Sequence, residues 1–143
     1  MDVDGAVKLM AKETILVVED EDALRTLLCR FFRLYGYDVL EARHGGEALL
    51  LSERHRGPIH LMVTDVVMPQ MSGKELADRL APLHPEMTVF FMSGYADGDL
   101  TAYGAPEPSE HFIPKPFRPM DLVKKVRDIL DAARGVTADA GPR

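Results

Sequence analysis

Residues 59–73 read IHLMVTDVVMPQMSG, and this stretch predicts one repeating unit of the fold. Its first half is an apolar run of strand length. A nearly continuous run of this kind is typical of a strand that is covered on both faces of a parallel sheet. The run ends at Asp65 and is followed by a Met-Pro turn. Ser72 and Glu75 then have the form of a capping box that opens a helix. The stretch therefore predicts a strand, a turn and a helix, with a carboxylate at the end of the strand.

The same alternation recurs along the chain. Four further apolar runs have strand length, and they read TILVV (14–18), YDVLEA (37–42), MTVFFM (87–92) and HFIP (111–114). Apolar residues at helical spacing follow three of the five runs. The predicted helix faces are Leu24, Leu27, Leu28, Phe31 and Leu34; Leu76, Leu80 and Leu83; and Leu122, Val123, Val126, Ile129 and Leu130. Strands that alternate with helices predict an α/β fold, a doubly wound sheet of five parallel strands with helices on both faces.

Two of the connections are less regular than the others. A helix is predicted around residues 46–54, where the apolar pattern is shorter. Residues 96–110, which read ADGDLTAYGAPEPSE, occupy the place of the fourth helix but contain few helix formers and two prolines. We therefore expect the fourth helix to be short or irregular.

The composition favours one globular domain. The chain has 143 residues, of which 46% are hydrophobic and 28% are charged. The periodic patterns confine the domain to residues 13–132, and residues 1–12 and 133–143 are predicted to be disordered tails. Against 23 Asp and Glu there are 17 Lys and Arg, which gives a net charge of -6. This balance argues against a nucleic-acid partner.

The sequence also indicates a compartment. Cys29 is the single cysteine and falls on the predicted apolar face of a helix, which fits a reducing environment. No apolar run approaches the roughly 20 residues that are needed to cross a bilayer, and the start MDVDGAVKLMAKE lacks the features of a signal peptide. We therefore expect a cytoplasmic domain that makes no membrane contact.

Polar residues gather where the predicted strands end. In open parallel sheets, ligands bind outside the carboxyl ends of the strands. The residues that follow the first, third, fourth and fifth strands are Glu19, Asp20, Glu21 and Asp22; Asp65; Ser93 and Gly94; and Lys115 and Pro116. Four connections are thus expected to bring an acidic cluster, a further carboxylate, a hydroxyl and an ammonium group to one edge of the sheet.

Each of these residues has an ordinary structural explanation when it is taken alone. Acidic residues are favoured at the start of a helix by the helix dipole. An Asp before a turn commonly forms an Asx turn, and a Lys before Pro is commonly solvated. The joint placement is harder to explain in this way, because independent coincidences would have to fall at the same edge.

The residues make chemical sense as one set. Clustered carboxylates repel one another unless a cation joins them, and Mg²⁺ takes carboxylate and phosphate oxygens as ligands. A carboxylate can also attack phosphorus to form an aspartyl phosphate. On this interpretation Asp65 is the nucleophile, and Asp20 and Asp65 bind the metal. Lys115 then pairs with the phosphoryl group, Ser93 donates a hydrogen bond to it, and Gly94 leaves room for the phosphodonor.

The joint pattern VVEDE (17–21), TDVVMPQMSG (64–73), FMSGYA (91–96) and FIPKPF (112–117) resembles the receiver domains of two-component response regulators. The resemblance covers about residues 13–132. It implies a flavodoxin-like receiver fold with five strands and five helices. It also implies that Mg²⁺, or Mn²⁺, supports transfer of a phosphoryl group from the phosphohistidine of a histidine kinase to Asp65. Such a domain is not an enzyme, although it assists its own phosphorylation and dephosphorylation.

The resemblance implies further roles at single positions. It implies a cis peptide bond between Lys115 and Pro116, and it makes the backbone carbonyl of Val67 a metal ligand. Glu19 would act on the metal through water. Ser93 and Phe112 would form the switch, in which a hydroxyl shift is coupled to a change of the aromatic rotamer.

The resemblance also implies partners. SGYADG and EPSEHFIPKPF are similar to receivers at the C-terminus of hybrid sensor histidine kinases, so the kinase would be part of the same polypeptide. A free-standing receiver that is served by a separate kinase or by a histidine phosphotransfer protein is the other option. The domain is expected to be a monomer or a weak homodimer.

Three other functions fit parts of the sequence. A haloacid-dehalogenase-type phosphatase also uses an Asp nucleophile, but it needs a second Asp two residues on, where this chain has Val67. A receiver that binds partners without being phosphorylated is compatible with the sequence, although Asp65, Asp20 and Lys115 argue against it. A nucleotide- or flavin-binding fold would need a Gly-rich or Ser/Thr-rich loop after the first strand, where this chain has acids.

Overall fold

A computed structural model of the chain describes residues 12–94 and 111–135. The elements in chain order are β1 (Thr14–Val18), α2 (Asp22–Leu34), β2 (Asp38–Ala42), α3 (Gly45–Arg54), β3 (Leu61–Asp65), α4 (Gly73–Leu80), β4 (Thr88–Gly94), β5 (Phe112–Lys115) and α5 (Pro119–Ala133). The expected tails and the expected fourth crossover helix fall largely or wholly outside the described residues. Helix α5 ends one residue beyond the predicted limit of the domain.

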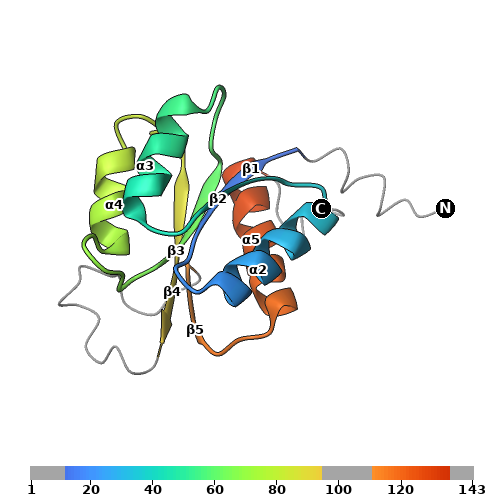
Figure 1. Cartoon of the computed structure of the whole chain (residues 1–143). Coiled ribbons are helices and arrows are strands. Elements are labelled where there is room, and N and C mark those ends of the chain that lie inside the picture. The colour runs from blue at the N-terminus through green and yellow to red at the C-terminus, as the bar shows by residue number, and fades with distance from the viewer. Residues whose placement is uncertain (1–11, 95–110, 136–143) are drawn as a thin grey trace.

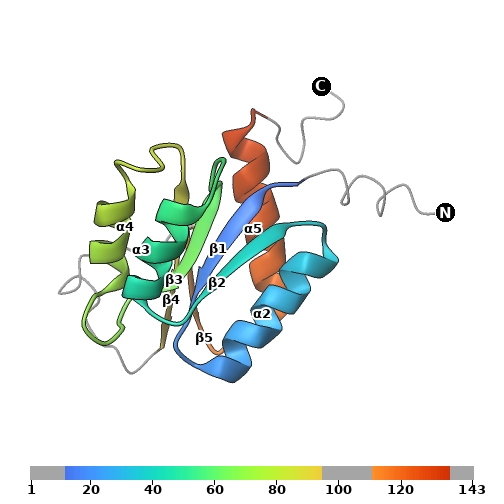
Figure 2. The ribbon, with the colours of Figure 1, turned by 45° about the horizontal axis from the view of Figure 1, so that its top comes forward.

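The five strands form one parallel sheet in the order β2-β1-β3-β4-β5. Helices α2 and α5 cover one face of the sheet, and α3 and α4 cover the other (Figure 1). Figure 2 shows the same two layers after a rotation of the molecule. The predicted doubly wound α/β fold is therefore confirmed for the described part of the chain. Within this part, no helix is both long enough and apolar enough to cross a bilayer.

Each face of the sheet has its own hydrophobic core. Alternate strand residues point to opposite faces, so one set packs against α2 and α5 and the other against α3 and α4. The first core contains Ile15, Val17, Leu61, Val63, Phe90, Met92 and Ile113, and the second contains Leu16, Val18 and Met62. Because β1 and β3 are buried on both faces, their sequences are apolar at nearly every position, and this explains why their positions could be predicted so closely.

The buried face of α2 differs from the predicted one. Its buried residues are Arg25, Leu28, Cys29 and Phe32, whereas Leu27 and Leu34 are exposed by 40% and 74%. The prediction was right for Leu28, and for Leu24 and Phe31, which are partly buried against the core, but wrong for Leu27 and Leu34. The helix carries apolar residues on more than one side, so its periodicity does not limit the buried face sharply. Phe32 settles the orientation, since its ring packs edge-on against Tyr37, with the centroids 5.8 Å apart.

Helix α4 is shorter than its apolar pattern predicts. Ser72 caps its start, since the hydroxyl oxygen accepts a hydrogen bond from the Glu75 amide at 3.1 Å. The helix ends at Leu80, and Leu83 lies in the following turn with half of its surface exposed. Leu83 is therefore not part of the buried helix face, in contrast to Leu76 and Leu80.

A buried cluster of charged side chains lies at the amino end of the sheet. Glu13, which is 3% exposed, accepts hydrogen bonds from Arg127 at 2.8 Å and from Arg134 at 2.9 Å. The Arg127 guanidinium also donates to the Tyr37 hydroxyl at 2.8 Å. Burial raises the pKa of Glu13, but the hydrogen bonds and the positive charge of the two arginines outweigh burial and lower it. This cluster ties α5 to the start of β1.

Replacing Glu13 tests this tie. A carboxyl group whose pKa is lowered by folding stabilises the protein above its ordinary pKa, and this contribution is lost as the pH falls. We expect Glu13→Gln to lower the free energy of unfolding by roughly 1–3 kcal/mol at about pH 7, because two arginines lose their charged partner. The difference should shrink as the pH falls below 4.5 and through the lowered folded-state pKa of Glu13, because wild-type Glu13 is then protonated. Urea denaturation from about pH 7 down through this range measures it; a loss that does not change with pH would mean that the charge is not responsible.

Candidate functional site

Three charged side chains continue the layer of the sheet that faces α2 and α5. Alternate residues of a strand share a face. The three series are Ile15, Val17 and Glu19; Leu61, Val63 and Asp65; and Ile113 and Lys115. The apolar layer therefore ends in two carboxylates and an ammonium group, all at the carboxyl edge of the sheet where the site was predicted.

Lys115 joins the two carboxylates. Its Nζ atom lies 2.7 Å from Oε1 of Glu19 and 2.7 Å from Oδ1 of Asp65. Glu19 is fully buried and Asp65 is 5% exposed. Because β4 lies between β3 and β5, the Lys115 side chain reaches past the end of β4, where its partner in register is Gly94. One lysine thus connects three strands.

The charges at this edge are not balanced. Burial raises the pKa of the Asp65 carboxyl, and repulsion from Glu19 raises it further; Lys115 acts in the opposite direction. The result is a pKa of about 8. For Lys115, burial lowers the pKa of the ammonium group, but the hydrogen bonds and charges of Asp65 and Glu19 outweigh burial and raise it. A single ammonium serves two buried carboxylates, so ionised Asp65 lacks sufficient positive charge.

The residues present fit a hard divalent cation. Glu19, Asp20 and Asp65 each offer a carboxylate oxygen, and these oxygens lie within 4.8 Å of one another. Among the described residues, Oδ2 of buried Asp65 has no hydrogen-bond partner. Both oxygens of Glu19 have one, since Oε1 contacts Lys115 and Oε2 accepts a hydrogen bond from the Glu21 amide at 2.9 Å. Carboxylates of this kind are ligands that Mg²⁺ and Mn²⁺ prefer.

The other predicted residues surround this group. Ser93 is buried at the end of β4, and its hydroxyl donates to the Gly94 carbonyl at 3.3 Å. Val67 is half-buried in the turn that follows β3. Phe112 is half-buried and packs with Val67 against the cluster that contains Val66, the residue directly after Asp65. Phe112 thus packs close to the turn that follows β3.

The peptide bond between Lys115 and Pro116 is cis, as the resemblance implies. It lies directly after β5, so the backbone changes direction at the residue that carries the ammonium group. Ser93, Gly94, Lys115 and Pro116 therefore come together at one edge, from two strands that pair in register.

Gly73 is a residue of the site that was not predicted from the sequence. Its amide donates a hydrogen bond to the carbonyl of Val66 at 2.9 Å, which brings the start of α4 against the end of β3. A Cβ atom at this position would overlap the carbonyl oxygen of Asp65 and lie 3.1 Å from Cγ2 of Thr64. Only glycine allows this approach without moving the backbone of Asp65. A glycine directly after the capping Ser72 was the available signal.

Arg25 is a second residue near the site that was not predicted from the sequence. This residue is 8% exposed, although it is charged, and it contacts the backbone of Glu19. An arginine among leucines at helical spacing is the only sequence signal for it, and the predicted helix face excluded it.

The family model of the response regulator receiver domain matches residues 15–127. The chain therefore belongs to the response regulator receiver domain family, and it is a receiver domain of two-component systems. The resemblance that the four sequence motifs carry is confirmed. The fold, and the cluster of Glu19, Asp20, Asp65 and Lys115 at the carboxyl edge of its sheet, are consistent with this family.

Particular relatives place the chain within that family. Sensor kinase CckA of Brucella abortus is 40% identical over 130 residues, which cover 90% of this chain and 14% of CckA. Response regulator receiver protein CpdR of the same organism is 32% identical over 119 residues, which cover 83% of this chain and 98% of CpdR. A cyclic di-GMP phosphodiesterase of Thermotoga maritima is 32% identical, and the match covers 27% of its length. The chain thus spans only a small part of CckA and of the phosphodiesterase, and nearly the whole length of CpdR.

Solved structures agree with this placement. The receiver domain from hybrid histidine kinase CckA superposes with a TM-score of 0.67 at 35% identity, and the match covers 82% of this chain and 98% of that domain. A CheY-like receiver domain protein from Methanospirillum hungatei JF-1 superposes with a TM-score of 0.75 at 28% identity, over 87% and 98% of the two chains. The predicted similarity to receivers of hybrid kinases is therefore confirmed.

Gly73 allows a direct test of how the end of β3 is held. We expect Gly73→Ala to lower the free energy of unfolding by roughly 1–3 kcal/mol, because the added methyl group meets backbone and not a movable side chain. Gly46→Ala is the matched control, since its Cβ would lie 3.5 Å from the ring of His44 at an exposed position of α3. The control should be neutral or stabilising by up to about 1 kcal/mol. Urea denaturation compares the two; equal effects would contradict the proposed contact.

The pKa of Asp65 predicts an unusual pH profile for protein kept free of divalent cations. A carboxyl group with a folded-state pKa of about 8, against an ordinary value of 3.8, makes folding less favourable as the pH rises between these values. Asp65→Asn lacks this group. We expect the variant to be more stable than wild type by roughly 1–3 kcal/mol at about pH 8, with little difference at about pH 4.

Urea denaturation in the presence of a chelator measures this difference across the pH range. Comparing the two proteins isolates Asp65 together with its coupling to Glu19 and Lys115, because the other titrating groups are shared. Adding Mg²⁺ at about pH 8 should stabilise wild type more than Asp65→Asn. A wild type that gains stability relative to the variant as the pH rises would contradict the raised pKa.

Proposed function

We propose that this receiver domain accepts a phosphoryl group on Asp65 from the phosphohistidine of a histidine kinase or a histidine phosphotransfer protein, in a reaction that depends on Mg²⁺ or Mn²⁺. The observation that carries the proposal is the state of Asp65. Its Oδ2 atom is buried and unpartnered among the described residues, beside Lys115 and within a cluster of three carboxylates. A structural carboxylate would be expected to have its oxygens satisfied.

The chemistry at Asp65 is a displacement at phosphorus. A carboxylate oxygen of Asp65 attacks the phosphorus atom and forms an O–P bond. The P–N bond of the phosphohistidine breaks, and its electron pair stays on the imidazole nitrogen. The products are an aspartyl phosphate and a histidine without its phosphoryl group. No further reactant is consumed, which fits a phosphoacceptor that assists its own modification and is not an enzyme with a separate substrate.

Lys115 stabilises the charge that collects on the phosphoryl oxygens. Its ammonium group already lies 2.7 Å from Asp65, so it needs little movement to contact a phosphoryl group attached there. Transfer of that contact from Oδ1 to the phosphoryl oxygens also leaves Glu19 as the second partner of the lysine. Ser93, at the end of the neighbouring strand, donates a hydrogen bond to the same oxygens.

The carboxylate cluster would hold the cation. Asp20 and Asp65 supply direct ligands, and the backbone carbonyl of Val67 supplies another. Glu19 acts through water, which fits the two protein partners that its oxygens already have. When bound, Mg²⁺ neutralises negative charge on the phosphoryl group and on the carboxylates. The raised pKa of Asp65 supports this role, because added positive charge favours the carboxylate form that attacks phosphorus.

Phosphorylation is read out by a change at the neighbouring turn. Val66 and Val67 follow Asp65, and Phe112 packs against them from β5. A shift of the Ser93 hydroxyl towards the phosphoryl group changes the space that is open to Phe112. Because a phenylalanine has no hydroxyl, the switch changes the burial of the ring and not its hydrogen bonds. The surface that results is recognised by a partner protein.

Two contexts for the domain are supported by relatives. Similarity to CckA, whose receiver domain belongs to a hybrid histidine kinase, supports a kinase in the same polypeptide. Similarity to CpdR over 98% of its length supports a free-standing receiver, with the kinase as a separate partner. Of the two, the higher identity to CckA favours the hybrid kinase.

The proposal is tested by intact mass spectrometry. Wild-type protein that is incubated with Mg²⁺ and acetyl phosphate, or with a phosphorylated histidine kinase, should gain one phosphoryl group. Asp65→Asn should gain none, and a chelator should prevent the gain in wild type. Asp78→Asn is the matched control, because this aspartate of α4 is exposed and pairs with Lys74 away from the site. It should be phosphorylated like wild type.

Two outcomes would contradict the proposal. If Asp65→Asn is phosphorylated as well as wild type, another residue is the acceptor. If wild type gains no phosphoryl group from either donor, the domain is a receiver that binds partners without being phosphorylated. A phosphatase function is not favoured, because Val67 occupies the position of the required general acid.

A further inference from the structure

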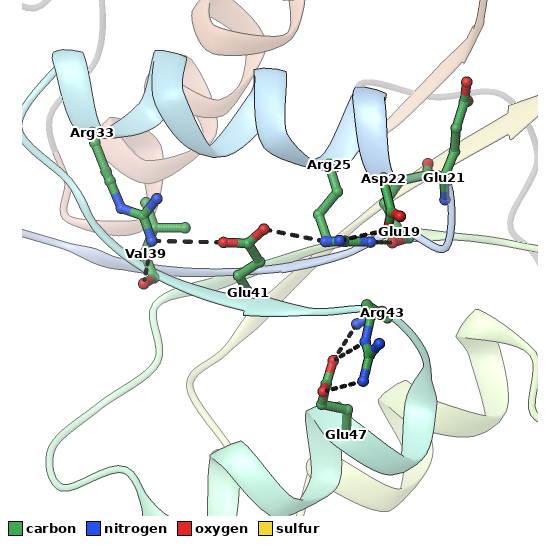
Figure 3. A network of polar contacts seen from close by, with 9 residues as sticks. All are labelled: Glu19, Glu21, Asp22, Arg25, Arg33, Val39, Glu41, Arg43 and Glu47. Atoms are coloured by element: carbon green, nitrogen blue, oxygen red, sulfur yellow. Dashed lines mark hydrogen bonds and ion pairs between the residues drawn. The ribbon is translucent and has the colours of Figure 1, made fainter.

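Arg25 connects three elements through one guanidinium group (Figure 3). Its Nη1 atom donates to the backbone carbonyl of Glu19 at 3.0 Å, and Nη2 donates to Oδ1 of Asp22 at 2.7 Å. Its Nε atom donates to Oε2 of Glu41 at 3.1 Å. The three acceptors belong to the residue after β1, the first turn of α2, and β2. The guanidinium therefore fixes the end of β1 relative to both neighbouring elements.

The burial of Arg25 is unusual for a charged side chain. Arg25 is 8% exposed, and the other buried residues of α2 are Leu28, Cys29 and Phe32. Burial lowers the pKa of the guanidinium, but the hydrogen bonds and charges of Asp22 and Glu41 outweigh burial and raise it. A guanidinium keeps its charge under all ordinary conditions and donates in a rigid plane, so it is suited to hold the groups that it contacts in fixed positions.

The backbone that Arg25 holds is the one that carries the acidic cluster. Glu19 offers its carbonyl to Arg25, while its carboxylate contacts Lys115 and accepts a hydrogen bond from the Glu21 amide. Asp20 lies between these two residues and is exposed, so its direction depends on the path of the backbone. The guanidinium holds this short segment at both ends, at Glu19 and at Asp22.

We propose that Arg25 is a positioning residue for the cation site: supported by Glu41 from β2, it fixes the backbone from Glu19 to Asp22 so that the carboxylates of Glu19 and Asp20 converge on Asp65. This inference rests on the proposed function, since it assigns a role toward the same cation. Partners of this outer kind commonly contribute about 10–100-fold to the affinity of a site for its metal.

Arg25 acts on the cation site in two opposite ways. As a positive charge near several carboxylates, it makes the site less attractive to a cation. As a holder of the backbone, it makes the site more favourable, because the ligands are placed before the cation arrives. The two effects predict changes of opposite sign when the guanidinium is removed. The sign of the change therefore separates the positioning role from a role in charge balance.

The test uses Arg25→Met and Arg25→Lys, with Arg127→Met as the matched control. Arg127 also makes several hydrogen bonds and pairs with a buried glutamate, but it lies at the amino end of the sheet. Two quantities are measured on each protein without any phosphodonor. They are the affinity for Mg²⁺ by titration calorimetry, and the hydrogen-exchange rate of the Glu21 amide in protein that has been treated with a chelator.

We expect Arg25→Met to weaken Mg²⁺ binding about tenfold and to speed exchange of the Glu21 amide. Arg25→Lys keeps the charge but cannot reach three acceptors in the planar arrangement of a guanidinium, so it should recover only part of the affinity. Arg127→Met should lower the stability of the fold and leave both quantities at their wild-type values. Glu41→Gln removes one support of the guanidinium and should give a smaller loss in the same direction.

Four outcomes would overturn the proposal. Two concern Arg25 itself: an Arg25→Met protein that binds Mg²⁺ as tightly as wild type or more tightly, and an Arg25→Lys protein with the Mg²⁺ affinity of wild type. The other two are an Arg127→Met protein that loses as much Mg²⁺ affinity as Arg25→Met, and a Glu41→Gln protein with wild-type affinity. If Arg25→Met does not fold, the Glu41→Gln result decides. If wild type binds Mg²⁺ but gains no phosphoryl group, the proposed function fails while the comparison of affinities still tests Arg25.

Phosphorylation rates add a readout that a purely structural role would not change. The Mg²⁺ concentration that gives half-maximal labelling by acetyl phosphate should rise about tenfold in Arg25→Met, in proportion to the lost affinity. The rate at saturating Mg²⁺ should change by less than about twofold, because Asp65 and Lys115 remain in place. A lower phosphorylation rate at saturating Mg²⁺, without a change in the Mg²⁺ concentration that gives half-maximal labelling, would contradict a role in positioning the cation ligands.

Discussion

The Lys115 ammonium group is the interaction on which the rest of the site depends. It contacts carboxylates from the ends of β1 and β3, and it extends from β5 past a strand that lies between. A buried carboxylate needs a positive partner, and here one partner is shared by two carboxylates. Ionised Asp65 therefore has too little positive charge beside it, and its pKa is raised to about 8. The proposed cation site and phosphoryl transfer both rest on this shortage of positive charge.

The parallel sheet explains why these groups meet. All carboxyl ends of its strands lie at one edge, so residues that are far apart in the sequence become neighbours there. The two apolar layers of the sheet keep water from the side chains beneath this edge. Two further residues hold the loops above it: Gly73 brings α4 against β3, and Arg25 joins β1 to α2 and β2. The backbone around the carboxylate cluster is thus held from both faces of the sheet.

Much of this arrangement could be predicted, because the relevant signals are local in the sequence. Strands that are buried on both faces are apolar throughout, and polar residues directly after them indicate the edge where Glu19, Asp65 and Lys115 lie. Which apolar residues of α2 are buried could be predicted only in part, since they lie on more than one side of the helix. The role of Arg25 depends on Glu41, which lies 16 residues further along the chain, on β2. The need for glycine at position 73 depends on a backbone contact that no sequence pattern contains.

Strand β1 is bounded by two buried carboxylates on the same face, Glu13 directly before it and Glu19 directly after it, with Ile15 and Val17 between them. Each carboxylate has a cationic partner that only the native alignment supplies. If the strand slipped by two residues against its neighbours, its apolar face would still point to the core, but one carboxylate would enter that core without a partner. The charges at the two ends therefore exclude this misaligned pairing, which hydrophobicity alone would tolerate.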